Sequence, residues 1–263
     1  MGYGIMNPII DIKSVTKKYV NAEGSTLTVL DDISLKVEPG SFLCVLGPSG
    51  CGKTTLLKLI GGFEPPTGGE LYINNSLITK PGIDRSMVFQ TFDQLLPWKT
   101  VGGNIEYPLK VNKIGESAIE RKEIVQKYLS LVGLEKFNNY YPHQISGGMK
   151  QRVAIARSLA QKPQVILMDE PFASLDAQTR NSLQEELYKI WQQTSVTIIF
   201  ITHNIQEAIV LGSKIVVLSK SPSNICLEID NPVDSSLGIR FPGSKGYDEC
   251  WKLLHEQIVL QSK

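Results

Sequence analysis

The chain has 263 residues, with 27 Lys and Arg against 26 Asp and Glu and a formal net charge of +1. This length allows one or two domains, and we expect one lobed domain. So balanced a charge disfavours nucleic acid as the main partner. No apolar run is long enough for a membrane span and the first residues lack the pattern of a signal peptide, which predicts a protein that stays in the cytoplasm. The cysteines lack metal-binding spacing, so we expect reduced thiols.

Alternation of apolar and polar residues predicts two antiparallel strands near the N-terminus. The first begins at Ile10 and ends at Tyr19, and the second covers residues 29–37, with residues 21–25 as the hairpin between them.

A glycine-rich loop follows the apolar run 42–46 and precedes the apolar helix that continues through Ile60. Glycines let successive backbone N–H groups and the helix N-terminus turn toward an anion, while Lys53 adds a cation and Thr54 a hydroxyl for Mg²⁺. A nucleoside triphosphate site is therefore predicted, and a glycine-rich turn without a ligand is the alternative. We expect an exposed Cys51 thiol in the empty loop, open to bulky thiol reagents. The predicted loop residues are Gly47, Pro48, Ser49, Gly50, Cys51, Gly52, Lys53, Thr54 and Thr55.

The rest of the chain alternates between predicted strands and helices. Strands are expected at residues 70–73, 83–89, 165–168, 196–201 and 215–218. Residues 91–163 have helical character, with a capping box from Ser117 to Glu120, and we expect an inserted helical lobe. Apolar stripes predict the buried helix faces Val125, Tyr128, Leu129 and Val132, then Leu183, Leu187, Ile190 and Trp191, and finally Trp251, Leu254 and Ile258. The predicted fold class is α/β, a mostly parallel sheet with flanking helices plus an antiparallel β lobe and the helical lobe.

Polar residues stand at the ends of three predicted strands, where parallel sheets bind their ligands. Asp169 and Glu170 follow the buried strand 165–168, and we expect Asp169 to hold Mg²⁺ and Glu170 to polarise the water that attacks the γ-phosphate. Gln90 and His203 each follow an apolar strand and are expected to sense the γ-phosphate or its water. Taken singly, each of these residues also fits a structural role.

A second Ser-Gly-Gly turn, Ser146-Gly147-Gly148, opens another predicted helix and forms another potential anion site. One phosphate loop already exists in the chain. The simplest explanation is that the second turn binds the same γ-phosphate from the other subunit of a two-fold dimer.

Taken together and in this order, these motifs resemble those of the ABC transporter ATP-binding subunits, over roughly residues 9 to 225. The resemblance implies an ATPase domain over 9–230 with its helical lobe at about 91–163, and a C-terminal extension over 231–263. It implies that Tyr19 stacks on adenine, although an ordinary strand-end tyrosine is the alternative. Thr54, Gln90 and Asp169 are implied as Mg²⁺ ligands, Lys53, Glu170 and His203 as catalytic residues, and Ser146, Gly147, Gly148, Gln151 and Asp176 as the contribution across the dimer.

Two further stretches are similar to the nitrate, sulfonate and taurine importer ATPases. They are Pro81 to Arg85 before Gln90 and Leu95 to Trp98 after it, although Lys99-Thr100-Val101-Gly102-Gly103 departs from that pattern. Phe92, Leu95, Leu96 and Trp98 offer an apolar groove for a short helix of a membrane partner. Packing inside the helical lobe is the alternative for these four side chains.

The resemblance therefore implies the motor of an importer: a homodimer at the cytoplasmic face of the membrane that hydrolyses MgATP and drives separate permease subunits, which receive the solute from a substrate-binding protein. A soluble ABC ATPase of DNA repair or translation is one alternative. The short stretch between Gln90 and Ser146 leaves no room for long coiled-coil arms, and the balanced charge also disfavours it. A phosphate-loop kinase is another alternative, but it leaves Ser146-Gly147-Gly148 unexplained.

Overall fold

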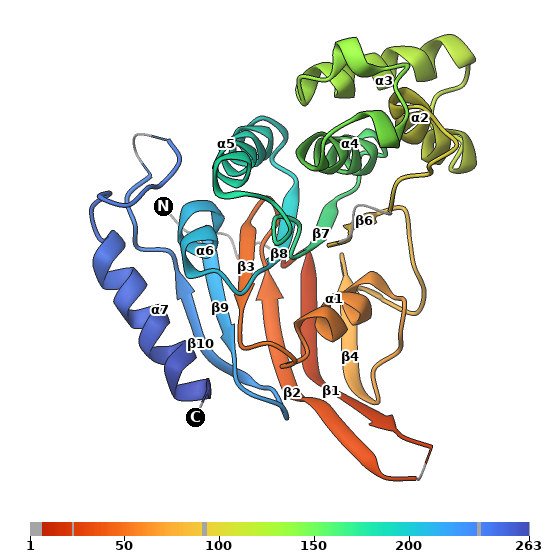
Figure 1. Cartoon of the computed structure of the whole chain (residues 1–263). Helices are drawn as coiled ribbons and strands as arrows, with labels where there is room; N and C mark the ends of the chain where they lie inside the picture. Colours follow the sequence, from red (N-terminus) through yellow and green to blue (C-terminus); the bar gives the residue numbers. More distant parts are fainter. Residues whose placement is uncertain (1–6, 23, 91–93, 236–237, 263) are drawn as a thin grey trace, which may run out of the picture. The chain divides into compact units, whose positions relative to one another are not determined.

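A computed structural model describes residues 7–22, 24–90, 94–235 and 238–262 of the chain. The chain divides into two compact units (Figure 1). The first comprises Met1–Gly82 with Ser195–Lys263, and the second comprises Ile83–Thr194.

An antiparallel sheet of the first unit has the strand order β2-β1-β4-β5. Its strands are β1 (Ile10–Val20), β2 (Thr26–Val37), β4 (Gly68–Ile73) and β5 (Ser76–Leu77). Strand β1 pairs with β2 from Ile10 opposite Val37 to Val20 opposite Thr26, which confirms the predicted hairpin. Apolar side chains on one face of β1, β2 and β4 are buried, as the alternation predicts.

The other strands of the first unit are buried and mainly parallel. Strand β3 (Phe42–Leu46) pairs in parallel with both β8 (Thr197–Ile201) and β9 (Lys214–Leu218), and β10 (Ile225–Asp230) adds antiparallel to β9. All residues of β3 and β8 are buried, which explains their continuous apolar runs. Helices α1 (Lys53–Gly61), α6 (Ile205–Leu211) and α7 (Tyr247–Ser262) complete this unit (Figure 1).

The second unit combines a parallel strand pair with helices. Strands β6 (Arg85–Val88) and β7 (Val165–Asp169) pair in parallel, with Val88 opposite Met168. Helices α2 (Val101–Val111), α3 (Ala118–Leu131) and α4 (Gly147–Ala160) pack on one another, and α5 (Ala177–Thr194) packs against α4 (Figure 1). Two short 3₁₀ turns, Glu135–Phe137 and Pro142–Gln144, lie between α3 and α4 in the chain.

Three expected helix details differ in the structure. Trp251 is 40% exposed and Ile258 is half-buried, whereas α7 buries the predicted Leu254 together with Tyr247 and Cys250, because this face is set by packing against α6 and β9. Trp191 is only half-buried at the end of its stripe. The capping box of α3 is half formed: Ser117 accepts from the Glu120 N–H at 3.0 Å, but the Glu120 carboxylate accepts from the Glu116 N–H. Among the described residues, no helix is long and apolar enough to cross a membrane.

Candidate nucleotide-binding site

The phosphate loop connects the buried end of β3 to α1 in the first unit. Gly50 and Gly52 have φ angles of 76° and 102°, a conformation that favours glycine. An added Cβ on Gly52 would lie 2.8 Å from the Val29 side chain, so this position also lacks room for a larger residue. In the part of the chain that the structure describes, no side chain caps the N-terminus of α1 and its first turn holds no acidic residue. The start of α1 is therefore suited to an external anion.

Lys53 crosses the loop and helps to fix its shape. Its Nζ donates to the carbonyl oxygens of Gly47 at 2.9 Å and Pro48 at 3.0 Å, and the side chain is only 5% exposed. Thr54 follows it and is exposed, while Thr55 is half-buried. The loop thus presents a held cation and a hydroxyl at the start of the helix.

The expected exposure of Cys51 is wrong. Its side chain is 1% exposed, and a Cβ built on Gly47 would lie 2.7 Å from its Sγ, which places the thiol against the Gly47 backbone. Burial raises the pKa of the Cys51 thiol, and the nearby Lys53 partly opposes this shift. The tight turn of the loop folds the side chain inward, which the sequence motif does not reveal.

Ser223, between β9 and β10, supports the phosphate loop and was not identified from the sequence. Its Oγ donates to the Cys51 carbonyl oxygen and lies 2.9 Å from the Ser219 carbonyl oxygen, and its side chain is fully buried. No sequence signal marks this serine, because it lies 172 residues from Cys51 in the chain. The pairing of β9 with β3 brings the two residues together.

Tyr19 lies near the end of β1 and is 36% exposed. Its hydroxyl donates to Glu64 Oε2 at 2.6 Å, and the Lys17 ammonium lies 4.9 Å from the centre of its ring. Burial and this hydrogen bond to Glu64 raise the pKa of Tyr19, while the Tyr19 hydrogen bond lowers the pKa of Glu64. The ring is therefore held in place with part of its surface available to a planar ligand.

His203 lies at the same edge of the sheet as the phosphate loop. Val45 of β3 is opposite Ile201 of β8, so both strands deliver their following residues at one end. His203 is exposed and precedes Asn204, whose side chain caps α6 by accepting from the Gln206 N–H at 2.8 Å.

Gln90, Asp169 and Glu170 follow the paired strands of the second unit. Because Val88 is opposite Met168 in this parallel pair, the residues that follow the two strands lie at the same edge. Asp169 is 7% exposed, whereas Gln90 is exposed and Glu170 half-buried. Glu170 has a φ of 42°, a left-handed backbone conformation that is rare outside glycine and often found at functional sites.

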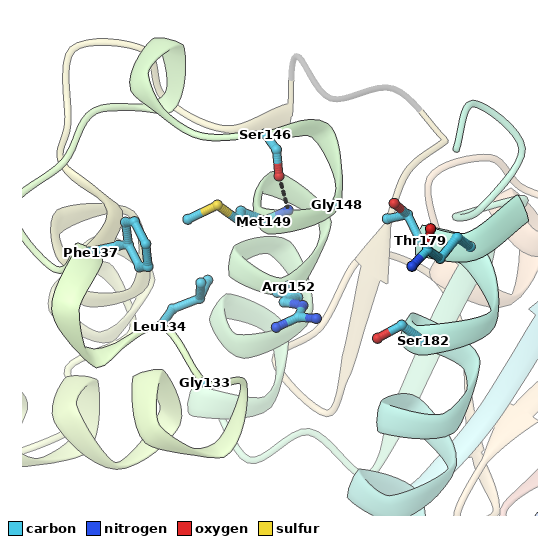
Figure 2. A pocket seen from close by; sticks show the side chains of 10 residues that line it. Gly133, Leu134, Phe137, Ser146, Gly148, Met149, Arg152, Thr179 and Ser182 are labelled. Atoms are coloured by element: carbon cyan, nitrogen blue, oxygen red, sulfur yellow. Dashed lines mark hydrogen bonds between the residues drawn. The ribbon is translucent and has the colours of Figure 1, made fainter. Parts of the chain in front are cut away.

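Ser146 caps α4 at the start of the second anion turn. Its Oγ accepts from the Met149 N–H at 3.3 Å (Figure 2). A pocket of about 410 Å³ opens beside it, lined by α4, α5 and the segment that follows α3. Figure 2 shows Arg152 of α4 and Thr179 and Ser182 of α5 around this pocket, and Arg152 also pairs with Glu186 at 2.6 Å. The turn and the start of α5 thus form one surface.

Asp176 precedes α5 and shapes its first turn. It accepts from the Thr179 N–H at 2.9 Å, which helps to lower the pKa of this exposed carboxyl. A Cβ on Gly148 would lie 2.7 Å from Thr179 Cγ2, so Gly148 allows α4 and α5 to approach closely. Gln151 is fully buried, and its amide atoms have no hydrogen-bond partner among the described residues. A role for Gln151 in nucleotide binding stays a prediction that this packing does not favour.

The residues proposed to form an apolar groove after Gln90 differ in their exposure. Trp98 is 71% exposed and Leu96 half-buried, but Leu95 is 3% exposed and belongs to the core of the second unit. Phe92 lies outside the described residues. The groove prediction is therefore wrong for Leu95, because its side chain packs inward, while Trp98 is available at the surface.

Polar side chains hold this segment. Asn104 is fully buried, accepts from the Leu96 N–H at 2.8 Å, and donates to the carbonyl oxygens of Leu96, Lys99 and Thr100 at 3.2, 3.2 and 3.0 Å. Gln94 donates to the Phe89 carbonyl oxygen at 2.9 Å, and Arg157 donates to the Gln94 carbonyl oxygen at 2.6 Å. Burial lowers the pKa of Arg157.

The glycine loop, its bound lysine and the uncapped helix start fit the phosphates of a nucleotide, and these features define a phosphate-loop nucleotide-binding protein. The ABC transporter family model matches residues 30–173, and the chain belongs to this family. ATP-binding members of the family are ATPases, and this chain is one of them.

Two relatives and one solved structure illustrate the similarity. The nitrate import ATP-binding protein of Synechocystis is 45% identical over 84% of this chain and 81% of its own length. The aliphatic sulfonates import ATP-binding protein of Bacillus cereus is 41% identical over 96% of this chain and 95% of its own. A dimeric ABC cassette in a post-hydrolysis state with ADP and Pi has a TM-score of 0.73 and 35% identity, and the match covers 84% of this chain and 98% of that one.

Proposed function

We propose that this chain is the ATP-hydrolysing motor subunit of an importer, which acts as a homodimer with two ATP molecules between its subunits. The observation that carries this proposal is a second Ser-Gly-Gly turn at the start of a helix, besides the phosphate loop: Ser146 caps the 14-residue helix α4, which begins with Gly147 and Gly148. The dimeric cassette structure and the import proteins among the relatives support it.

The proposed ATP contacts involve residues of both units. Tyr19 would stack on the adenine, and Lys53 with the loop N–H groups would bind the β- and γ-phosphates. Ser146, Gly147 and Gly148, with Asp176 beside them, would approach the γ-phosphate of the partner's ATP. For Mg²⁺, Thr54, Gln90 and Asp169 supply the oxygen donors that this hard cation prefers. When bound, the ion would offset negative charge on the phosphate oxygens.

Glu170 is the proposed general base. Its carboxylate would accept a proton from water while the water oxygen bonds to the γ-phosphorus and the bond between that phosphorus and ADP breaks. His203, at the same sheet edge as the phosphate loop, would hold the γ-phosphate or its water in line.

The proposed partners are a second copy of the chain and separate permease subunits that receive solute from a substrate-binding protein. The chain would then work at the cytoplasmic face of the membrane. The exposed Trp98 indole is the proposed anchor for a permease helix. The proposed cargo is a small solute of the nitrate, sulfonate or taurine kind, and the nitrate, sulfonate and taurine import proteins among the relatives support this class.

A Glu170→Gln variant tests the proposed chemistry and the homodimer together. Loss of the base should lower turnover by about two to four orders of magnitude while ATP still binds. Because uncleaved ATP would keep bridging the subunits, size-exclusion chromatography with light scattering should show dimers in ATP and monomers without nucleotide. Glu185→Gln on the exposed side of α5 is the matched control and should behave as wild type. Normal hydrolysis by Glu170→Gln, or a monomer at high protein concentration with ATP, would falsify the assignment.

A further inference from the structure

Helix α1 begins at the phosphate loop and ends in a turn, residues 62–67, that leads back to strand β1. Gly62 closes the helix in a left-handed conformation with a φ of 74°, and its N–H donates to the Leu59 carbonyl oxygen at 3.0 Å. The Phe63 N–H donates to the Lys58 carbonyl oxygen at 2.9 Å. The last turn of α1 therefore fixes the direction in which the following residues leave the helix.

Hydrogen bonds attach this turn to β1. The Thr67 N–H donates to the Thr16 carbonyl oxygen at 2.8 Å, and the Lys18 N–H donates to Thr67 Oγ1 at 2.9 Å. These bonds lie on the stretch of β1 that leads directly to Tyr19. The turn thus connects the helix that starts at the phosphate loop with the strand that carries this ring.

Glu64, in the middle of the turn, completes the connection through its side chain. Its Oε2 accepts from the Tyr19 hydroxyl at 2.6 Å and lies 3.3 Å from Lys17 Nζ, and its Oε1 lies 3.4 Å from Lys58 Nζ. The Lys17 ammonium is buried and also donates to the Pro65 carbonyl oxygen at 2.9 Å. The bond from Tyr19 is the strongest of these contacts, because it is short and charge-assisted, whereas the pair with the exposed Lys58 contributes little.

The neighbours of Tyr19 act on different parts of its ring. Glu64 holds the hydroxyl at the edge, and the Lys17 ammonium lies 4.9 Å from the ring centre, over one face. The ring is nevertheless 36% exposed, so surface for a planar ligand is left. A ring whose edge and one face are both held has one orientation to offer to a stacking partner.

We propose that Glu64 is a positioning residue for nucleotide binding, which holds the Tyr19 ring at the place and orientation, relative to the phosphate loop, that let one ligand engage both. This inference rests on the proposed stacking of Tyr19 on adenine. Without the bond to Glu64, the phenol can turn about its side-chain torsions, and the orientation that stacks becomes one of several. The apparent dissociation constant then rises as the population of that orientation falls.

The test compares two ligands of the full chain in the presence of Mg²⁺: a non-hydrolysable ATP analogue, and inorganic tripolyphosphate, which has the phosphates but no base. Calorimetry measures the analogue directly and tripolyphosphate by displacement of the analogue. Glu64→Ala should raise the Kd of the analogue about three- to tenfold. The Kd of tripolyphosphate should stay within about twofold, and KM for ATP should change more than kcat, because the loss concerns the base alone.

Glu70→Ala is the matched control. Glu70 Oε2 accepts from the Tyr72 hydroxyl at 2.7 Å on the exposed side of β4, so this variant removes a similar bond between a tyrosine and a glutamate. Both dissociation constants should stay at the wild-type values. An effect on the analogue equal to that of Glu64→Ala would show that any such surface bond matters and would overturn the proposal.

Two further variants isolate the hydrogen bond. Tyr19→Phe removes the hydroxyl but keeps the ring, and it should weaken the analogue about as much as Glu64→Ala. The double variant should be no weaker than either single variant, within about twofold, since both changes remove the same bond. Glu64→Gln keeps an acceptor oxygen for the hydroxyl and should recover most of the affinity.

Thermal unfolding establishes that each variant is folded at the temperature of the titration. Wild-type affinity for the analogue in Glu64→Ala, equal weakening of both ligands, or additive losses in the double variant would overturn the proposal. If Glu64→Ala does not fold, Tyr19→Phe decides, and wild-type affinity there overturns the proposal equally.

Tyr19→Ala separates this inference from the proposed function. Loss of the ring should weaken the analogue about 5- to 100-fold, the usual effect of removing an aromatic partner of a base. Wild-type affinity of Tyr19→Ala contradicts the proposed stacking itself. Weak binding by Tyr19→Ala together with wild-type affinity of Glu64→Ala contradicts the positioning role of Glu64 alone.

Discussion

Two loops of this protein each leave the end of a parallel strand and precede a helix, but they are held in different ways. The phosphate loop after β3 is fixed chiefly from within, by Lys53 on its own carbonyl oxygens and by the inward Cys51 thiol, with one further hydrogen bond from Ser223. The segment after β6 is fixed by side chains that reach it from helices, chiefly Asn104 of α2 and Arg157 of α4.

The difference matches what each loop has to do. A loop bonded within itself keeps its shape before the ligand arrives, so little binding energy is lost in ordering it. A segment tied to helices by a few polar side chains shifts together with those helices. We infer that the first loop binds nucleotide, whereas the second passes a change at Gln90 to the exposed Trp98.

Of the changes that test this comparison, removal of the cation that crosses the phosphate loop should have the largest effect. Lys53→Met removes both the charge offered to the phosphates and two hydrogen bonds within the loop. Turnover should fall by about 10² to 10³, the cost of losing one preorganised donor at a charged transition state. The same substitution at Lys36, exposed on β2, should leave hydrolysis unchanged. Comparable rates of ATP hydrolysis for the two variants would contradict the role of Lys53 in holding the phosphate loop.

Thiol labelling compares the buried Cys51 of the phosphate loop with the half-buried Cys226 of β10. In the folded chain, Cys51 should react with a bulky disulfide reagent about tenfold or more slowly than the half-buried Cys226, and unfolding in urea should remove this difference. Burial raises the pKa of Cys51, so its thiolate forms, and labelling accelerates, at higher pH in the folded than in the unfolded chain. Mass spectrometry of labelled peptides gives the order, and rapid labelling of Cys51 at neutral pH would disprove the inward thiol.

Asn104→Ala should loosen the segment after β6. The change leaves the Leu96 N–H and three carbonyl oxygens without their shared partner. We expect a loss of about 2 to 3 kcal/mol in the free energy of unfolding, seen as a fall in Tm of about 5 to 10 °C. Asn139→Ala, at an exposed position of the same unit, should change stability by less than about 0.5 kcal/mol. Equal Tm values for the two variants would mean that Asn104 does not hold the segment.

The smallest effect on the isolated chain is expected at Trp98. Because its side chain is 71% exposed, Trp98→Ala should change the free energy of unfolding by less than about 0.5 kcal/mol and leave ATP binding intact. Assembly with the permease should nevertheless weaken by more than about 2 kcal/mol, as for a buried aromatic anchor of an interface. Trp251→Ala, which removes another exposed indole, is the control and should assemble normally. Unchanged assembly of Trp98→Ala would remove the anchor role, and a large fall in Tm would make Trp98 a core residue.

The sequence by itself determined the local features of this protein. A glycine loop between an apolar strand and a helix can take few backbone paths, so residues 47–54 predicted the phosphate loop, and Ser146 was recognisable as a helix cap. Alternation with a period of two predicted the hairpin of β1 and β2 in the same way.

Only the tertiary structure decided which neighbours each of these features has. The inward turn of Cys51, the support from Ser223 and the division of Leu95 from Trp98 depend on elements far apart in the chain. Local patterns specify backbone conformation and an apolar face. The partner of a buried polar group is set by how strands and helices pack, because the partner of such a group usually comes from a distant part of the chain and an unpaired buried polar group is costly.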